Sequence, residues 1–166
     1  MVPACPYDAS VKFEQATAIL AAFDREKVRY VLIGSMAMAA QGIIRATLDI
    51  DFFVSPDAAN VDRIKRALRS AFDDASIDEI DPDDLAGPYP VIRYGPPDDD
   101  FVIDLVGRLG EAFRFEDIES EELLVGGIPV RVATPRMLYR MKRDTVRPQD
   151  RLDAANIRVA FGLEEE

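Results

Sequence analysis

The sequence predicts an α/β protein in which helices and strands alternate along a chain of 166 residues. Apolar residues recur at helical spacing in several segments, and short apolar runs that end at turn residues indicate strands between them. Hydrophobic residues make up 48% of the chain and charged residues 31%, which is typical of a folded globular protein. No linker divides the chain, so we expect a single domain over residues 1–166.

The first half of the chain alternates between helical and strand patterns. After an N-terminal arm (residues 1–10), the expected elements are a helix over 11–26, a strand over 30–33, a helix over 36–41, a strand over 48–54 and a helix opened by Ser55-Pro56-Asp57. Ser35 is the expected N-cap of the second helix, and Gly42 its stop.

The second half begins with the acidic, proline-bearing segment 73–88, which we expect to be mostly loop and a candidate lid. The later elements are expected to be strands over 89–94 and 101–106, a hairpin of 123–125 with 128–132 around Gly126-Gly127, and a helical segment over 135–162 with helices to about 143 and over 149–161.

Composition excludes several kinds of chemistry. The chain has no histidine, so it cannot use serine–histidine or cysteine–histidine catalysis, and one cysteine cannot form an internal disulfide. Any metal would be held by oxygen atoms, which favours Mg²⁺ or Mn²⁺. No signal pattern or long apolar span is present, so we expect a cytoplasmic protein without membrane contact.

Charge is distributed unevenly around a net value of -11. Residues 73–104 contain eleven acidic residues and one basic residue, Arg93, whereas residues 136–158 contain seven basic and three acidic residues. The basic stretch is either a solvated helix face or a wall that attracts phosphate. The net charge argues against a generic polyanion-binding protein.

Three aspartates and a small-residue turn form the candidate site. Asp49 and Asp51 are two positions apart, so on a strand they leave the same face, where they repel each other unless a cation lies between them. Asp104 lies in an apolar run, where an uncompensated charge is costly. If its strand pairs with the strand of Asp49 and Asp51, the carboxylates converge. Gly34-Ser35 upstream is suited to a turn that a triphosphate approaches.

These motifs resemble the nucleotidyltransferase superfamily, the fold of the polymerase-beta-like enzymes, which has a Gly-Ser turn, a two-aspartate strand and a third aspartate. The stretch from Gly34 to Asp51 most resembles small bacterial members, the AbiEii-like and MenA-like toxins of toxin–antitoxin systems. Residues 141–153 resemble the lysine helix of the family and its Arg-Pro-Lys-Asp motif, with Gln149 in place of the lysine.

The resemblance implies an α/β (α+β) fold with a mixed central sheet and flanking helices, and metal-dependent transfer of a nucleoside monophosphate from an NTP such as ATP. Asp49, Asp51 and Asp104 would be the catalytic and metal-binding residues. The nucleotide-binding residues would be Gly34, Ser35, Arg45, Thr47 and Lys142. Asp150 and Asp153 are expected to pair with arginines of the last helix instead of taking part in chemistry.

Several functions remain open at this point. The leading one is a nucleotidyltransferase toxin that modifies tRNA or a protein and has an antitoxin partner. Transfer to a small molecule, as in antibiotic-modifying relatives, would suit the acidic segment 73–100. Two further alternatives involve no catalysis: a nucleotide-binding module and a purely structural partner protein.

Overall fold

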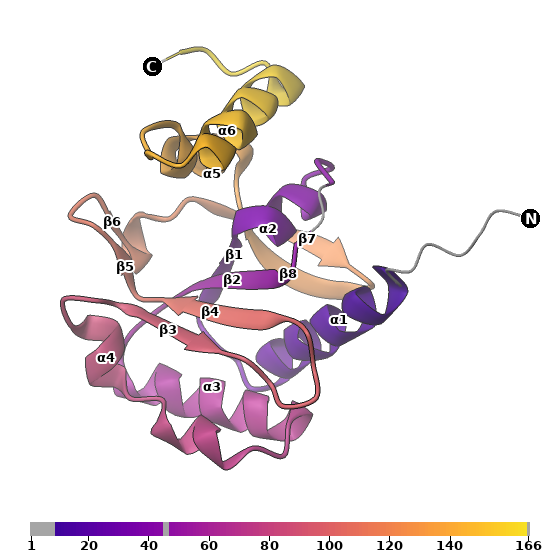
Figure 1. Cartoon of the computed structure of the whole chain (residues 1–166), viewed down its shortest axis with the longest axis vertical. Helices are drawn as coiled ribbons and strands as arrows, with labels where there is room; N and C mark the ends of the chain where they lie inside the picture. The colour runs from indigo at the N-terminus through magenta and orange to yellow at the C-terminus, as the bar shows by residue number, and fades with distance from the viewer. Residues whose placement is uncertain (1–8, 45–46, 166) are drawn as a thin grey trace, which may run out of the picture.

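A six-stranded mixed β-sheet forms the centre of the computed structural model, which describes residues 9–44 and 47–165 (Figure 1). The strand order is β3-β4-β2-β1-β8-β7. These strands are β1 (Tyr30–Ile33), β2 (Asp49–Val54), β3 (Val91–Tyr94), β4 (Val102–Val106), β7 (Ser120–Val125) and β8 (Ile128–Ala133). A small second sheet pairs β5 (Arg108–Leu109) with β6 (Phe113–Arg114).

Both parallel and antiparallel pairs occur in the large sheet. β2 is parallel to β4 and antiparallel to β1, and β1 is parallel to β8. The outer pairs β3–β4 and β7–β8 are antiparallel. The mixed sheet with flanking helices confirms the expected fold class, and it leaves β2 in the middle, with β1 and β4 as its neighbours.

Helices cover the sheet on both sides. The α-helices are α1 (Ala9–Arg25), α2 (Gly34–Ala40), α3 (Ala58–Ala71), α4 (Pro82–Ala86), α5 (Pro135–Arg143) and α6 (Pro148–Phe161), and the 3-10 helices are η1 (Ala75–Glu79) and η2 (Phe115–Asp117). Figure 1 shows α1 and α3 on one side of the sheet, and α2 with the helical hairpin α5–α6 on the other. In the part of the chain that the structure describes, no helix is long and apolar enough to cross a bilayer.

An aromatic cluster fixes the orientation of β2. The ring of Phe52 lies 4.7 Å from that of Phe23 on α1 and 5.4 Å from that of Tyr30, between ring centroids. Phe52 is therefore on the face that α1 covers. Because successive strand residues point to opposite faces, Asp49 and Asp51 point to the other face, toward α2 and the α5–α6 hairpin.

Two local expectations were wrong. The second helix begins at Gly34 with Ile33 as its N-cap, so Ser35 lies inside the helix and caps nothing. Segment 73–88 is not mostly loop, since it contains η1 and α4. The side chain of Asp74 accepts a hydrogen bond at the start of η1 and that of Asp81 at the start of α4. In contrast, α5 begins at Pro135 as expected, and the Thr134 side chain caps it.

Candidate functional site

Strand register brings the three aspartates to one face of the sheet. On β2, Asp51 lies directly opposite Ile33 of β1 on one side and Asp104 of β4 on the other. Asp49 is one pleat further along β2 on the same face. The pairing of the two aspartate-bearing strands, on which convergence depended, is present. The site therefore lies where β1 ends, beside the turn into α2.

Gly34 forms that turn in close contact with Asp51. Its φ is +68°, a backbone conformation that glycine adopts readily, and a Cβ built on it would overlap the Asp51 carboxylate. Ser35 follows with only 4% of its surface exposed. The backbone of the turn thus lies against the carboxylate because residue 34 has no side chain.

Gly34→Ala is expected to lower the free energy of unfolding by about 2–3 kcal/mol, because it adds a steric overlap to an unfavourable φ. Denaturant unfolding measures this loss. Gly110→Ala is the matched control, since Gly110 has a φ of +54° and open space where its Cβ would be. Equal losses in the two variants would show that the contact with Asp51 contributes nothing.

The surroundings of Asp51 disfavour the charged form of its carboxyl group. Burial, the neighbouring Asp104 and Asp49 charges and a hydrogen bond to Asp104 raise the pKa of Asp51 from 3.8 to about 7. Lys142 acts in the opposite direction and favours the charged form. Carboxylates packed this closely share a proton or need a cation.

Arg93 of β3 binds Asp104. Its Nε and Nη2 atoms donate to Oδ1 and Oδ2 of Asp104 at 3.0 Å each, a bidentate ion pair. The two residues are also directly opposite in the β3–β4 register. Arg93 was not among the residues expected in the site, and the signal that could have found it is its position as the single basic residue of 73–104.

Of the two residues expected in the loop before β2, one can be described. The Thr47 hydroxyl accepts a hydrogen bond from the Asp49 backbone N–H at 3.1 Å. This hydrogen bond holds the end of the loop against the first residue of β2. Arg45 lies outside the described residues.

Lys142 lies in an ion-pair cluster that joins α5 to α6. Its ammonium group donates hydrogen bonds to Asp150 at 3.1 Å and to Asp153 at 2.9 Å. Only 9% of the surface of Lys142 is exposed. Gln149 donates to Asp153 as well. In these ion pairs the partner of Asp150 and Asp153 is a buried lysine of α5, where arginines of the last helix were expected.

Lys142→Met is expected to lower the free energy of unfolding by about 2–4 kcal/mol, because it removes a cation that lies 2.9 Å from the buried Asp153 carboxylate and 3.1 Å from that of Asp150. Thermal or urea unfolding measures the loss, and Asp153→Asn in the same chain should recover part of it. Lys27→Met is the control, since the Lys27 side chain is 77% exposed. If the free energy of unfolding falls equally little in both methionine variants, the cluster does not stabilise the packing of α5 against α6.

The carboxylate oxygens of the three aspartates suit a hard divalent cation, although the side chains do not converge on a single point that a cation could occupy. Carboxylate oxygens are the ligands that Mg²⁺ and Mn²⁺ prefer, and a cation would relieve the repulsion at Asp51. Across the described ranges, no group of three acidic side chains is arranged to hold a metal ion as it stands. Asp104 is the carboxylate that Arg93 already holds.

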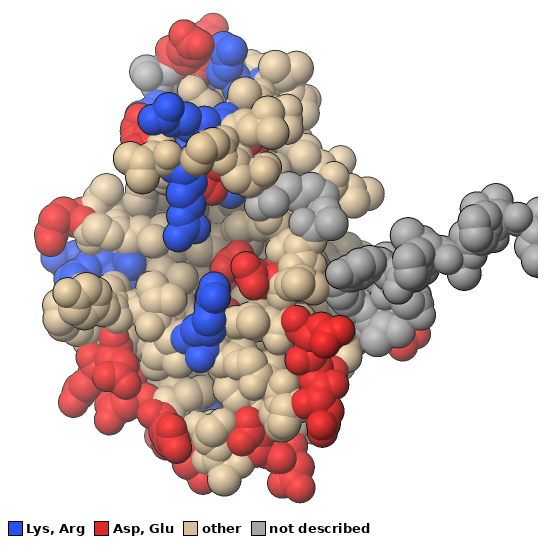
Figure 2. Space-filling model, viewed as in Figure 1, with Lys and Arg blue, Asp and Glu red and all other residues tan. Residues whose placement is uncertain are grey.

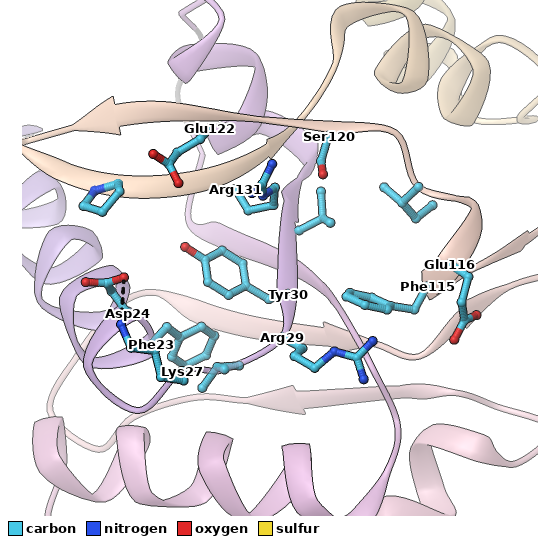
Figure 3. A pocket seen from close by; sticks show the side chains of 14 residues that line it. Phe23, Asp24, Lys27, Arg29, Tyr30, Phe115, Glu116, Ser120, Glu122 and Arg131 are labelled. Atoms are coloured by element: carbon cyan, nitrogen blue, oxygen red, sulfur yellow. Dashed lines mark ion pairs between the residues drawn. The ribbon is translucent and has the colours of Figure 1, made fainter.

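A cavity of about 470 Å³ opens elsewhere, near the start of β1. Figure 3 shows Phe23, Tyr30 and Phe115 lining it, with Arg29 and Glu122 among its charged residues. Burial raises the pKa of Tyr30 to about 12, so its hydroxyl stays protonated. The aspartates of the candidate site do not line this cavity.

Residues 18–154 match the family described as the nucleotidyl transferase AbiEii toxin of a type IV toxin–antitoxin system. The chain belongs to the AbiEii nucleotidyltransferase family. Nucleotidyl transfer is thus the reaction class of this protein, and nucleotidyltransferases of this kind typically use divalent metals. No curated protein sequence matches the chain significantly.

Solved structures share the fold of this AbiEii family member. A candidate nucleotidyltransferase from Thermotoga maritima superimposes with a TM-score of 0.55 at 17% identity, over 93% of this chain and 91% of that one. The antibiotic-resistance factor ANT(2'')-Ia in solution gives 0.57 at 16% identity, over 92% and 85%. ANT(2'')-Ia in complex with adenylyl-2''-tobramycin gives 0.56 at 14% identity, over 92% and 90%.

Proposed function

We propose that this chain transfers a nucleoside monophosphate from a Mg²⁺- or Mn²⁺-bound NTP, such as ATP, to an acceptor hydroxyl and releases pyrophosphate. The observation that carries this proposal is the register that aligns Asp51 with Asp104 and puts Asp49 on the same face, beside the Gly34 turn. Membership of the AbiEii family supports it.

Each proposed site residue has a distinct task. Asp49 and Asp51 hold the divalent cations, and Asp104 completes the site at the acceptor. When bound, the cations offset phosphate charge and lower the pKa of the attacking hydroxyl. Gly34 and Ser35 let the phosphates approach the backbone at the end of β1.

Two further residues support the nucleotide site in this proposal. Lys142 contributes positive charge toward the triphosphate from α5, in keeping with its effect on the pKa of Asp51. Thr47 keeps the loop before β2 in place through the Asp49 backbone. Arg45 would complete the set as a phosphate contact, on the strength of the sequence resemblance alone.

The acceptor is proposed to be a tRNA or a protein, modified by a toxin that a cognate antitoxin counteracts. The family description supports the toxin role. The basic stretch 136–158 spans α5 and α6. Figure 2 shows blue side chains across the middle and upper part of the face in view, with some red ones among them and at the top, and more red along the lower margins. A polyanionic acceptor would be attracted to the basic part.

Transfer to a small cationic acceptor is the second candidate. The fold shared with ANT(2'')-Ia, whose structure holds an adenylyl-tobramycin, favours it. The acidic residues of segment 73–100 would attract such a cation. The two candidates differ in the molecule that becomes labelled.

Incubation with each α-³²P-labelled NTP and Mg²⁺ or Mn²⁺ tests the proposal. The acceptors are total tRNA, a cell extract freed of nucleic acid, and a set of aminoglycosides. Label in tRNA or protein supports the toxin, whereas label in the aminoglycosides alone supports the second candidate. NTP binding without transfer to any acceptor would indicate a non-catalytic nucleotide-binding module and contradict the proposal.

A further inference from the structure

The ion pair between Arg93 and Asp104 is built into the sheet. The residues are directly opposite across the antiparallel β3–β4 pair, so the backbone brings the side chains together. Both oxygens of Asp104 accept from the guanidinium group, at 3.0 Å each. The carboxylate proposed to complete the metal site is therefore engaged by a protein cation.

The two partners differ in their freedom to move. The Asp104 side chain is 11% exposed and projects from β4, which lies between two strands, whereas the Arg93 side chain is 65% exposed on the edge strand β3. Rotation of Arg93 into solvent leaves the sheet intact. Arg93 is therefore the partner that can leave.

A divalent cation and a guanidinium group compete for the same carboxylate. Each is attracted to Asp104 and Asp51, and the two repel each other when both are close. A cation that approaches Asp104 would therefore meet the guanidinium group that already pairs with this carboxylate.

We propose that Arg93 is a built-in counter-cation that competes with the divalent metal ion for Asp104, so that metal binding displaces its guanidinium group from the carboxylate. Arg93 then lowers the affinity of the site for metal and limits repulsion among the carboxylates before metal arrives. This inference rests on the proposed function, since it concerns the same three aspartates. The opposite role, in which Arg93 orients Asp104 for the metal, makes the opposite prediction.

Calorimetric binding of Mn²⁺ to the full chain, without nucleotide, separates the two roles. Arg93→Gln is expected to bind Mn²⁺ about tenfold more tightly than the wild type, the size of effect expected for a bidentate hydrogen bond between charged groups. Arg93→Lys keeps the charge and should stay closer to the wild type. Unchanged or weaker binding by Arg93→Gln would overturn the proposal.

Arg66→Gln is the matched control for net charge. The Arg66 side chain is 53% exposed and pairs with Glu26, on the side of the sheet away from the aspartates. Its removal should leave Mn²⁺ affinity unchanged. If it tightens binding as much as Arg93→Gln does, the effect is one of overall charge and the proposal is wrong. Circular dichroism melts confirm that each variant is folded.

A double-mutant cycle shows whether Arg93 acts through Asp104. In an Asp104→Asn background the carboxylate charge is gone, so Arg93→Gln should change Mn²⁺ affinity by less than about twofold. A full tenfold gain in that background would mean that Arg93 repels the metal without engaging Asp104, which contradicts the proposal.

The outcomes also distinguish this inference from the proposed function. Binding by the wild type that is lost in Asp51→Asn, with no gain in Arg93→Gln, overturns the inference alone. Binding by Arg93→Gln where the wild type binds too weakly to measure supports the inference. Absence of Mn²⁺ binding in both proteins would contradict the inference and the metal-dependent function together.

Discussion

Asp51→Asn is expected to abolish nucleotidyl transfer, with a loss of at least about 1,000-fold in kcat/KM. Asp51 lies at the centre of the site, between the Gly34 turn and Asp104. An amide in its place cannot supply the negative charge that a divalent cation requires. Asp49→Asn should have an effect of the same order, because it is the neighbouring carboxylate on the same face.

Loss of activity in these variants should not come from loss of the fold. The pKa of Asp51 is raised to about 7, so the folded chain binds a proton that the unfolded chain releases near 3.8. Without metal, the stability contributed by protonated Asp51 is present below about pH 4 and is lost as pH rises toward 7. The Asp51→Asn variant has no carboxyl group at this position and would carry no such dependence.

Unfolding by urea in EDTA between pH 5 and pH 8 measures this difference. The wild type should lose about 1–3 kcal/mol relative to Asp51→Asn across that range. Asp57→Asn is a control, since the pKa of Asp57 is lowered by its bond to Ser55 and that carboxyl is charged throughout the range. An active Asp51→Asn variant, or one that is less stable than the wild type at pH 8, would contradict this account of the site.

Asp104→Asn is expected to lower kcat by about 100-fold or more while changing nucleotide affinity by less than about fivefold. Asp104 is proposed to act at the acceptor hydroxyl, whereas Asp49 and Asp51 act on the triphosphate as well. Its removal therefore affects the chemical step more than the binding of Mg²⁺·NTP.

Single-turnover transfer and equilibrium binding of the same NTP separate these effects. Asp104→Glu serves as a second variant, since it keeps the charge but moves it by one methylene group. Equal losses in nucleotide binding and in the chemical step would show that Asp104 has no distinct task. A small loss in kcat would show that another group acts at the acceptor.

The shared face of Asp49 and Asp51 could be predicted from the sequence because it depends on a short-range pattern, whereas their convergence with Asp104 required that β2 pair with β4. Alternation in 48–54 sets Asp49 and Asp51 on one face, and Thr134-Pro135 marks the start of α5. Both signals act over a few residues, where strand periodicity and helix capping are well defined. The structure agrees at each of these positions.

Long-range contacts could not be predicted in the same way. The pairing of Arg93 with Asp104 depends on the register of the β3–β4 hairpin, and that of Lys142 with Asp153 on how α6 packs against α5. Neither is a local pattern. The short helices η1 and α4 do have local signals, caps at Asp74 and Asp81, but these lie in an acidic, proline-bearing stretch that resembles a loop.

Calorimetric binding of the four NTPs with Mg²⁺ or Mn²⁺ to the wild type and to an Asp49→Asn/Asp51→Asn double variant tests the central claim most directly. The account predicts saturable binding of at least one NTP that requires the metal and is lost in a folded double variant. Metal-independent binding, binding that survives in the variant, or no binding of any NTP by the folded wild type would contradict a nucleotide site at these aspartates.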